Sequence, residues 1–362
     1  MLFPVNGSHF DMRLGGLVMA GAAATVVVFW GPRTLARFKI VSRWWLVRMA
    51  VGLGVLVLAI LGALAFVIPV FRFPHPSGPH AIGTLTYHWV DASRADIFAA
   101  DANAHRELMA QVWYRADAAP SPTRAPYMQE ADAVTGALAR IHDTPRFLFS
   151  QFKYVTTNAV ASVRVADGQP GYPVLIFLEG AAGFRVLTGR LDLQRVGTFG
   201  VSLGGIVPGV VCLHETHVRA CLLMDAPMTT AAVASGLATP GRWITREVAS
   251  MRLERQLSGG WSEADIDAHQ TSMRAVYESL PGAGYFLRVP GTFHLDFTDT
   301  PNWTPLASWL NLTGPIDGQR AHNIVNAYSL AFFDRHLAGR PAKLLDGPTE
   351  RYPEVLFESR AP

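Results

Sequence analysis

A short stretch near the middle of the chain decides the fold class. It reads Arg195-Val196-Gly197-Thr198-Phe199 and continues into Gly200-Val201-Ser202-Leu203-Gly204-Gly205. The first part is an apolar strand pattern, the second is a glycine-rich turn around a serine, and an apolar, helix-compatible segment follows. This strand–turn–helix order is typical of a nucleophile elbow, in which the glycines allow a sharp turn and the helix N-terminus favours negative charge beside the serine. We therefore predict that Ser202 is a nucleophile at the carboxyl end of a strand.

A glycine-rich turn between a strand and a helix can also bind phosphate, or bind nothing. The stretch after Gly200 lacks the lysine of a P-loop. It also lacks the glycine spacing of a dinucleotide-binding fingerprint. The elbow interpretation is therefore favoured.

Further apolar runs on both sides of the elbow predict the rest of the sheet. A capping box at Ser262 and Asp265 begins a helical pattern that Pro281 stops, and a second apolar stripe runs over 324–332. Strands that alternate with helices predict an α/β domain with a mostly parallel sheet. The expected strands, besides 195–199, are 84–90, 108–114, 173–178, 220–224 and 285–289.

A serine nucleophile needs a base and an acid that orients the base, and the chain offers both at strand ends. Asp225 follows the predicted strand 220–224, and His294 follows the strand 285–289. Carboxyl ends of parallel strands meet at one edge of a sheet, and the chain order Ser, Asp, His is that of α/β-hydrolases. Asp296 and Asp299 are alternative acids, but their closeness to His294 in sequence favours a role as loop caps.

These segments resemble the plasma-type platelet-activating-factor acetylhydrolases and their bacterial relatives, an α/β-hydrolase family. The resemblance covers about residues 81–340, and the 23-residue interval from Ser202 to Asp225 is its most telling detail. It does not cover the apolar N-terminal runs. The segments that carry it are 106–114, 174–185, 200–205, Asp225, 291–294 and 314–333.

The resemblance implies an α/β-hydrolase fold and a role for each site residue. Ser202 would be the nucleophile, His294 the general base and Asp225 the acid that orients His294. Backbone N–H groups of Ala181 and Leu203 would form the oxyanion hole, where each donor typically contributes about 10²–10³ in rate. The implied substrate is a short-chain or oxidised ester or phospholipid, and no metal or organic cofactor is needed.

One length departs from this family. Only residues 186–194 separate Arg185 from the elbow strand, where relatives place a helix, a strand and a second helix. We expect one strand of the sheet to be missing, and we predict that the strands 108–114 and 173–178 close up and pair directly. The loop 180–183 should be the most displaced part of the site.

Two apolar, uncharged runs at 14–30 and 49–71 predict two transmembrane helices. A cleaved signal peptide is the alternative for the first run, but no small-x-small cleavage site follows it. Four basic residues in the loop 31–43, against one on each outer flank, place this connector in the cytoplasm and both termini outside. We expect a multi-pass anchor over 1–72, a Pro/Gly-rich linker over 73–80 and a periplasmic catalytic domain over 81–362.

Composition excludes several other classes. Residues 1–72 carry seven basic side chains and one acidic one, which leaves 24 basic and 27 acidic for the rest of the chain. The folded part thus has no basic excess for nucleic acid. His214-Glu215-Thr216-His217 lacks the spacing of a zinc motif. A location outside the cytoplasm permits a disulfide between Cys212 and Cys221, but two buried thiols are favoured.

Three functions are consistent with the sequence. The first is a membrane-tethered serine ester hydrolase for short or oxidised acyl chains. The second, suggested by the missing block, is a catalytically impaired hydrolase fold that binds a lipid or protein partner. The third is a polyester or cutinase-type hydrolase, which would share the same elbow.

Overall fold

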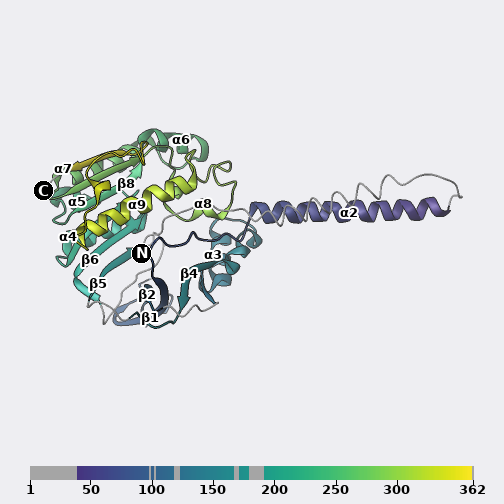
Figure 1. Ribbon diagram of the computed structural model, residues 1–362, viewed down its shortest axis with the longest axis horizontal. Helices are drawn as coiled ribbons and strands as arrows, with labels where there is room; N and C mark the ends of the chain where they lie inside the picture. Colours follow the sequence, from purple (N-terminus) through teal and green to yellow (C-terminus); the bar gives the residue numbers. More distant parts are fainter. Residues whose placement is uncertain are drawn as a thin grey trace.

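The computed structural model describes residues 39–97, 99–101, 103–117, 123–166, 171–178 and 191–360. They form an α/β domain with two sheets, from which one long helix projects (Figure 1). The first predicted membrane run, 14–30, lies outside these residues. So do the loop 180–183 and, within it, Ala181.

The larger sheet has six strands in the order β10-β9-β8-β7-β6-β5. Its strands β5 to β9 are parallel, and the last strand, β10, is antiparallel to β9. The expected mostly parallel α/β sheet is therefore present. The strand bounds are β5 (Tyr172–Leu178), β6 (Leu191–Val201), β7 (Val218–Met224), β8 (Gly241–Arg246), β9 (Gly284–Val289) and β10 (Leu356–Arg360).

Helices cover both faces of this sheet (Figure 1). On one face, Ile324, Tyr328 and Phe332 of α9 pack on the strands. On the other face, α4, α5 and α7 bury residues such as Ala232 and Met273. The helix bounds are α4 (Leu203–His214), α5 (Thr230–Ser235), α6 (Val248–Ser258), α7 (Glu263–Ser279), α8 (Thr300–Trp303) and α9 (Gly318–His336), with short 3-10 turns η2 (His294–Phe297) and η3 (Lys343–Leu345).

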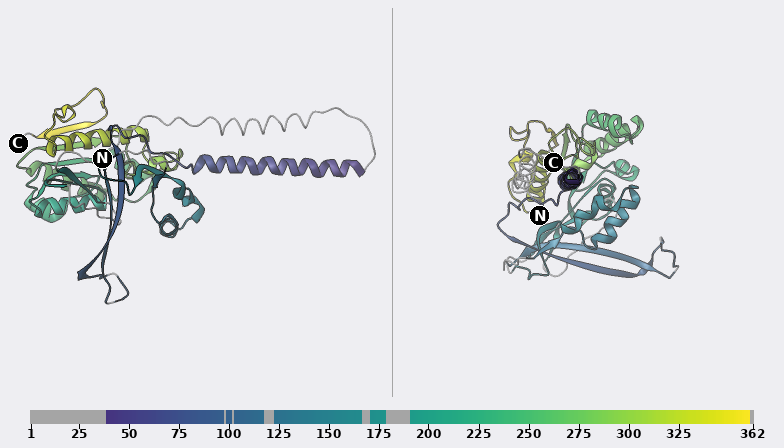
Figure 2. Two further views of the ribbon diagram at one scale, coloured as in Figure 1. Left: turned by 60° about the horizontal axis from the view of Figure 1, so that its bottom comes forward. Right: turned by 90° about the vertical axis from the view of Figure 1, so that its right-hand side faces the viewer.

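The expected direct pairing of the strands 108–114 and 173–178 is wrong. The strand over the first range, β2, belongs to a separate four-stranded sheet of order β2-β1-β4-β3. It forms a long antiparallel hairpin with β1 (Figure 2), so its backbone groups find partners without β5. The bounds here are β1 (Ala81–Ala95), β2 (His105–Ala116), β3 (Arg124–Pro126), β4 (Thr156–Ala161), α3 (Ala131–Ile141) and the 3-10 helix η1 (Arg146–Tyr154).

The long projecting helix is α2 (Lys39–Val67). The predicted bounds 49–71 were wrong, because the helix begins ten residues earlier and ends before Pro69, whose ring disfavours helical backbone at the preceding residue. Its segment Trp44–Val67 is exposed, and it is long and apolar enough to cross a membrane by length and composition. It is the one such helix within the described part of the chain.

The chain after α2 packs onto the domain through an aromatic cluster, which we call the junction cluster. It contains Phe71, Phe73, Tyr127, Phe152 and Trp303. Phe71 lies edge-on to Tyr127 and Phe152, with ring centroids 5.6 and 6.2 Å apart, and Phe152 lies 5.0 Å from Trp303. The cluster thus joins the end of α2 both to the smaller sheet and to α8.

Cys212 and Cys221 form a disulfide, so the expectation of two free thiols was wrong. Cys212 lies in the last turn of α4, and Cys221 lies in β7, which packs directly beneath that helix. Nine residues separate them in sequence, but their Cα atoms are 6.4 Å apart, within the range that a disulfide bridges.

Candidate active site

Ser202 occupies a sharp turn between β6 and α4, as the glycine pattern predicts. Its backbone has φ 58° and ψ −131°, a conformation that costs a non-glycine residue energy and that concentrates at functional sites. A Cβ atom at Gly200 would lie 2.0 Å from the carbonyl oxygen of Gly204, and one at Gly205 would lie 2.5 Å from Ala226. Glycine at 200 and 205 is therefore what lets strand and helix approach this closely.

The structure brings Ser202, Asp225 and His294 together at the carboxyl edge of the larger sheet. Nε2 of His294 lies 2.9 Å from Oγ of Ser202, and Nδ1 lies 2.5 Å from Oδ2 of Asp225. Asp225 directly follows β7, and His294 begins η2 after β9. Asp225 is fully buried, whereas the His294 side chain keeps 21% of its surface exposed. One imidazole can therefore contact both the carboxylate and the serine.

The two alternative acids have other partners. Oδ2 of Asp296 accepts hydrogen bonds from the backbone N–H groups of Phe293 and Gly314, both at 2.7 Å. Asp299 accepts one from the hydroxyl of Tyr127 at 3.0 Å. Asp296 therefore caps the loop that carries His294, in line with the role that its position in sequence favours.

The Asp225 carboxylate is held from several directions. Oδ1 accepts hydrogen bonds from the Thr245 hydroxyl at 2.8 Å and the Arg246 backbone at 3.3 Å. Nε of Arg246 lies 2.7 Å from Oδ2, and Nε2 of His269 lies 3.3 Å from Oδ1. Burial by itself would raise the pKa of Asp225, but the Arg246 charge and the hydrogen bonds from His269 and His294 hold that pKa well below its usual range.

A second carboxylate, Glu254 of α6, lies on the other side of His294. It accepts from the backbone N–H of His294 at 3.2–3.3 Å and binds Nη1 of Arg246 at 2.5 Å. Sequence reasoning missed Arg246 and Glu254, because no strand or helix was recognised between β7 and α7. It also missed His269, which lies in the predicted helix α7 and has no motif that marks it. The one available hint was the run Gly241-Arg242-Trp243-Ile244-Thr245-Arg246, whose centre is aromatic and β-branched.

The predicted oxyanion donors can be placed only in part. Leu203 is the first residue of α4, where backbone N–H groups have no partner within the helix, and its side chain is 64% exposed beside Ser202. Its amide is therefore one of the N–H groups that the helix itself leaves without a partner. Ala181 lies outside the described residues.

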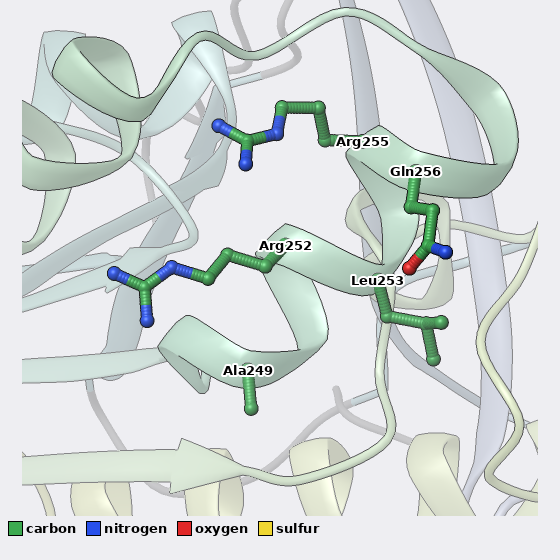
Figure 3. A pocket seen from close by; sticks show the side chains of 5 residues that line it. All are labelled: Ala249, Arg252, Leu253, Arg255 and Gln256. Atoms are coloured by element: carbon green, nitrogen blue, oxygen red, sulfur yellow. The ribbon is translucent and has the colours of Figure 1, made fainter.

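Two surface depressions are lined by residues other than Ser202, Asp225 and His294. One of about 580 Å³ is lined by Ala249, Arg252, Leu253, Arg255 and Gln256 of α6, and its two arginines extend to the same side (Figure 3). Both arginines bind Glu263 at 2.7 Å, which ties α6 to α7. In the part of the chain that the structure describes, no group of three or more His, Cys, Asp and Glu could hold a metal ion. His214 ends α4, and residues 215–217 form the turn that follows.

No family model matches the chain, and no curated protein matches it. Among solved structures, a ferulic acid esterase from Streptomyces cinnamoneus is similar, with 25% sequence identity and a TM-score of 0.60. The similarity covers 78% of this chain and 98% of the esterase. The chain therefore has an α/β fold that resembles an esterase, and the similarity supports an ester hydrolase in general terms.

Proposed function

We propose that the chain is a serine carboxylic-ester hydrolase that works through an acyl-enzyme. The observation that carries the proposal is the pair of contacts made by His294, 2.9 Å to Ser202 and 2.5 Å to Asp225. The esterase similarity supports the same reaction class. The alternative of a catalytically impaired hydrolase fold finds no support in this geometry, because the three side chains are within hydrogen-bond reach.

Each residue has a defined role in this mechanism. Ser202 Oγ attacks the ester carbonyl while Nε2 of His294 takes its proton. Asp225 holds the Nδ1–H tautomer and stabilises the imidazolium that forms. The amide of Leu203, with that of Ala181 as the resemblance implies, receives the developing oxyanion. His294 then returns the proton to the leaving alcohol, and water releases the acyl group by the same steps.

The substrate class that we propose is a short or oxidised acyl ester on a phospholipid or small alcohol, as in the platelet-activating-factor acetylhydrolases that the sequence resembles. A feruloyl ester is the second candidate, because the similar structure is a ferulic acid esterase. A polyester remains the third. Rates on an acetyl-glycerophosphocholine, on ethyl ferulate and on a polyester film would rank the three.

We also propose that α2 anchors the protein in a bilayer with the catalytic domain outside the cytoplasm. The exposed apolar surface of Trp44–Val67 supports an anchor, and the Cys212–Cys221 disulfide supports an oxidising compartment. The second membrane helix over 14–30 stays part of this proposal. A carboxyl-terminal alkaline phosphatase fusion should be active and a green fluorescent protein fusion dark; the reverse pattern would refute the orientation.

The test of the activity compares the wild type with Ser202→Ala. The wild type should hydrolyse p-nitrophenyl acetate and bind a fluorophosphonate probe covalently at Ser202. The variant should lose the labelling and all turnover above the background reaction. Equal rates in both proteins would refute the proposal. An unlabelled, inactive wild type would favour the alternative of a catalytically impaired hydrolase fold that binds a lipid or protein partner.

A further inference from the structure

Arg246 is the last residue of β8, and its side chain is completely buried. It contacts the carboxylates of both Asp225 and Glu254. We propose that Arg246 is a positioning residue, which fixes the ring of His294 through Asp225 and its backbone through Glu254. This inference rests on the proposed serine hydrolase function. Three sets of contacts carry it.

The first set fixes the ring of His294 through Asp225. Oδ2 of Asp225 is 2.5 Å from Nδ1 of His294 and 2.7 Å from Nε of Arg246, so one oxygen serves both side chains. The other oxygen is held by the Thr245 hydroxyl and the Arg246 backbone. The carboxylate therefore cannot rotate without breaking its ion pair with Arg246, and the imidazole keeps its direction toward Ser202.

The second set fixes the main chain of His294 through Glu254. Oε2 of Glu254 lies 2.5 Å from Nη1 of Arg246, and both oxygens of Glu254 face the His294 backbone N–H at 3.2–3.3 Å. The guanidinium group thus bridges Asp225, which orients the ring of His294, and Glu254, which holds its backbone. A planar guanidinium suits this double contact, whereas a lysine ammonium has a single charged point.

The third contact is with Trp261. The guanidinium carbon of Arg246 lies 4.8 Å from the Trp261 ring centroid, and that ring is edge-on to His294 at 6.0 Å. Arg246 is therefore enclosed by one aromatic face and two carboxylates. These partners offset the cost of burying the guanidinium charge. Removal of Arg246 would leave buried carboxylates without a counter-charge.

Loss of Arg246 should affect the reaction in two ways. A looser imidazole lowers kcat, because small misplacements of a catalytic group cost about 10²-fold, while KM changes little. The charged groups around His294 also change, since Asp225 and Glu254 are no longer neutralised and the remaining neighbour is His269. Two free carboxylates favour the protonated imidazole, so the acid limb of the pH–rate profile should move to higher pH.

The test compares Arg246→Lys with Arg242→Lys in the full-length chain. Arg242 is a matched control because it lies in the same strand, is equally buried, and packs on Tyr328 and Phe332 away from Ser202. A lysine at 246 keeps one positive charge, but its single ammonium cannot contact both Asp225 and Glu254 as the guanidinium does, so one carboxylate loses its partner. We expect R246K to lower kcat about 10- to 100-fold with KM within about twofold, to slow fluorophosphonate labelling, and to move the acid limb to higher pH. R242K should keep the wild-type pH profile.

A wild-type kcat and pH profile in R246K would overturn the proposal. Should R246K fail to fold, Glu254→Gln carries the test, because it keeps an acceptor for the His294 backbone but removes the charge that holds Arg246. A loss of kcat in E254Q that is smaller than about 10-fold, with KM within about twofold, supports the proposal, and a wild-type kcat in E254Q refutes it. If the wild type itself shows neither turnover nor labelling, the proposed function fails and the role of Arg246 falls with it.

Discussion

The hydroxyl of Tyr127 donates a hydrogen bond of 3.0 Å to Oδ2 of Asp299, 172 residues away in sequence. Tyr127 directly follows β3 of the smaller sheet, and Asp299 directly follows the loop that carries His294. Tyr127 also belongs to the junction cluster. This bond therefore links the part of the domain nearest α2 to the segment that positions the imidazole.

Tyr127→Phe should destabilise the protein by about 1–2 kcal/mol, because it leaves the Asp299 carboxyl with one donor fewer in a partly buried place. Burial already raises the pKa of Asp299, and Tyr127 counteracts that rise. Urea unfolding would measure the loss. Tyr154→Phe is the control, since Tyr154 is 62% exposed and should change stability by less than about 0.5 kcal/mol. Equal effects of both substitutions would contradict the link.

Gly200→Ala should abolish activity or folding. The added methyl would meet the Gly204 and Leu178 carbonyl oxygens at 2.0 and 2.6 Å, and a backbone atom cannot move aside as a flexible side chain can. The esterase assay and circular dichroism would report the outcome. Gly282→Ala, where nothing lies within 4 Å of the new methyl, should behave as the wild type.

Replacing both Cys212 and Cys221 by alanine should lower the free energy of unfolding by about 2–3 kcal/mol, the loop-entropy value for a short closed loop. Thermal melts of the oxidised wild type and the double variant would measure it. Thiol titration of the unfolded, unreduced wild type provides a direct check. Two reactive thiols per chain would show that the bond does not form.

Stability should fall as the pH drops from about 6.5 to about 4 because of His336. Burial, followed by the charges of Arg335 and Arg242, lowers the pKa of His336 to about 4. A histidine whose folded-state pKa is depressed stabilises the fold above its unfolded pKa of about 6.5, and that contribution is lost as the pH falls through the folded value.

After allowance for its partial exposure, the contribution of His336 is on the order of 1–2 kcal/mol. Melting curves at pH 7.5 and pH 4.5 would show a smaller difference for His336→Gln than for the wild type. An equal drop in both proteins would assign the acid sensitivity to other groups.

The convergence of Ser202, Asp225 and His294 could be predicted because each follows a strand with a strong apolar pattern. Parallel strands bring their carboxyl ends to one edge, so the order of motifs in the chain is enough to place them. Their catalytic roles stay a proposal. The strands that carry them, β6, β7 and β9, extend the predicted ranges by one to four residues at their ends.

Strand β8 could not be predicted in the same way. Two of its six residues are arginines, a composition typical of an exposed segment, yet all six are buried. Arg246 is neutralised by Asp225 and Glu254, and Arg242 donates to the carbonyl of Tyr328 and packs on aromatic rings. These partners lie in three different segments, after β7, in α6 and in α9, so only the folded chain reveals why charge is tolerated there.

The division of the strands into two separate sheets could not be predicted from the apolar pattern of the sequence either. An apolar strand such as 108–114 could join the edge of either sheet. The length of the chain between 108–114 and 173–178 does not tell which sheet it joins. The local hairpin with β1 decides the outcome, since it satisfies β2 before a distant strand is needed.

The junction cluster has a consequence for how such an enzyme would meet its substrates. Phe71 and Phe73 follow α2 within six residues and pack into the domain, and the backbone of Pro74 accepts a hydrogen bond from Asn158 at 2.7 Å. If α2 spans a bilayer as proposed, no flexible linker lets the catalytic domain move independently of the membrane helix. Its serine would stay at a constant height above the lipid, and encounters would depend on two-dimensional diffusion of the whole molecule.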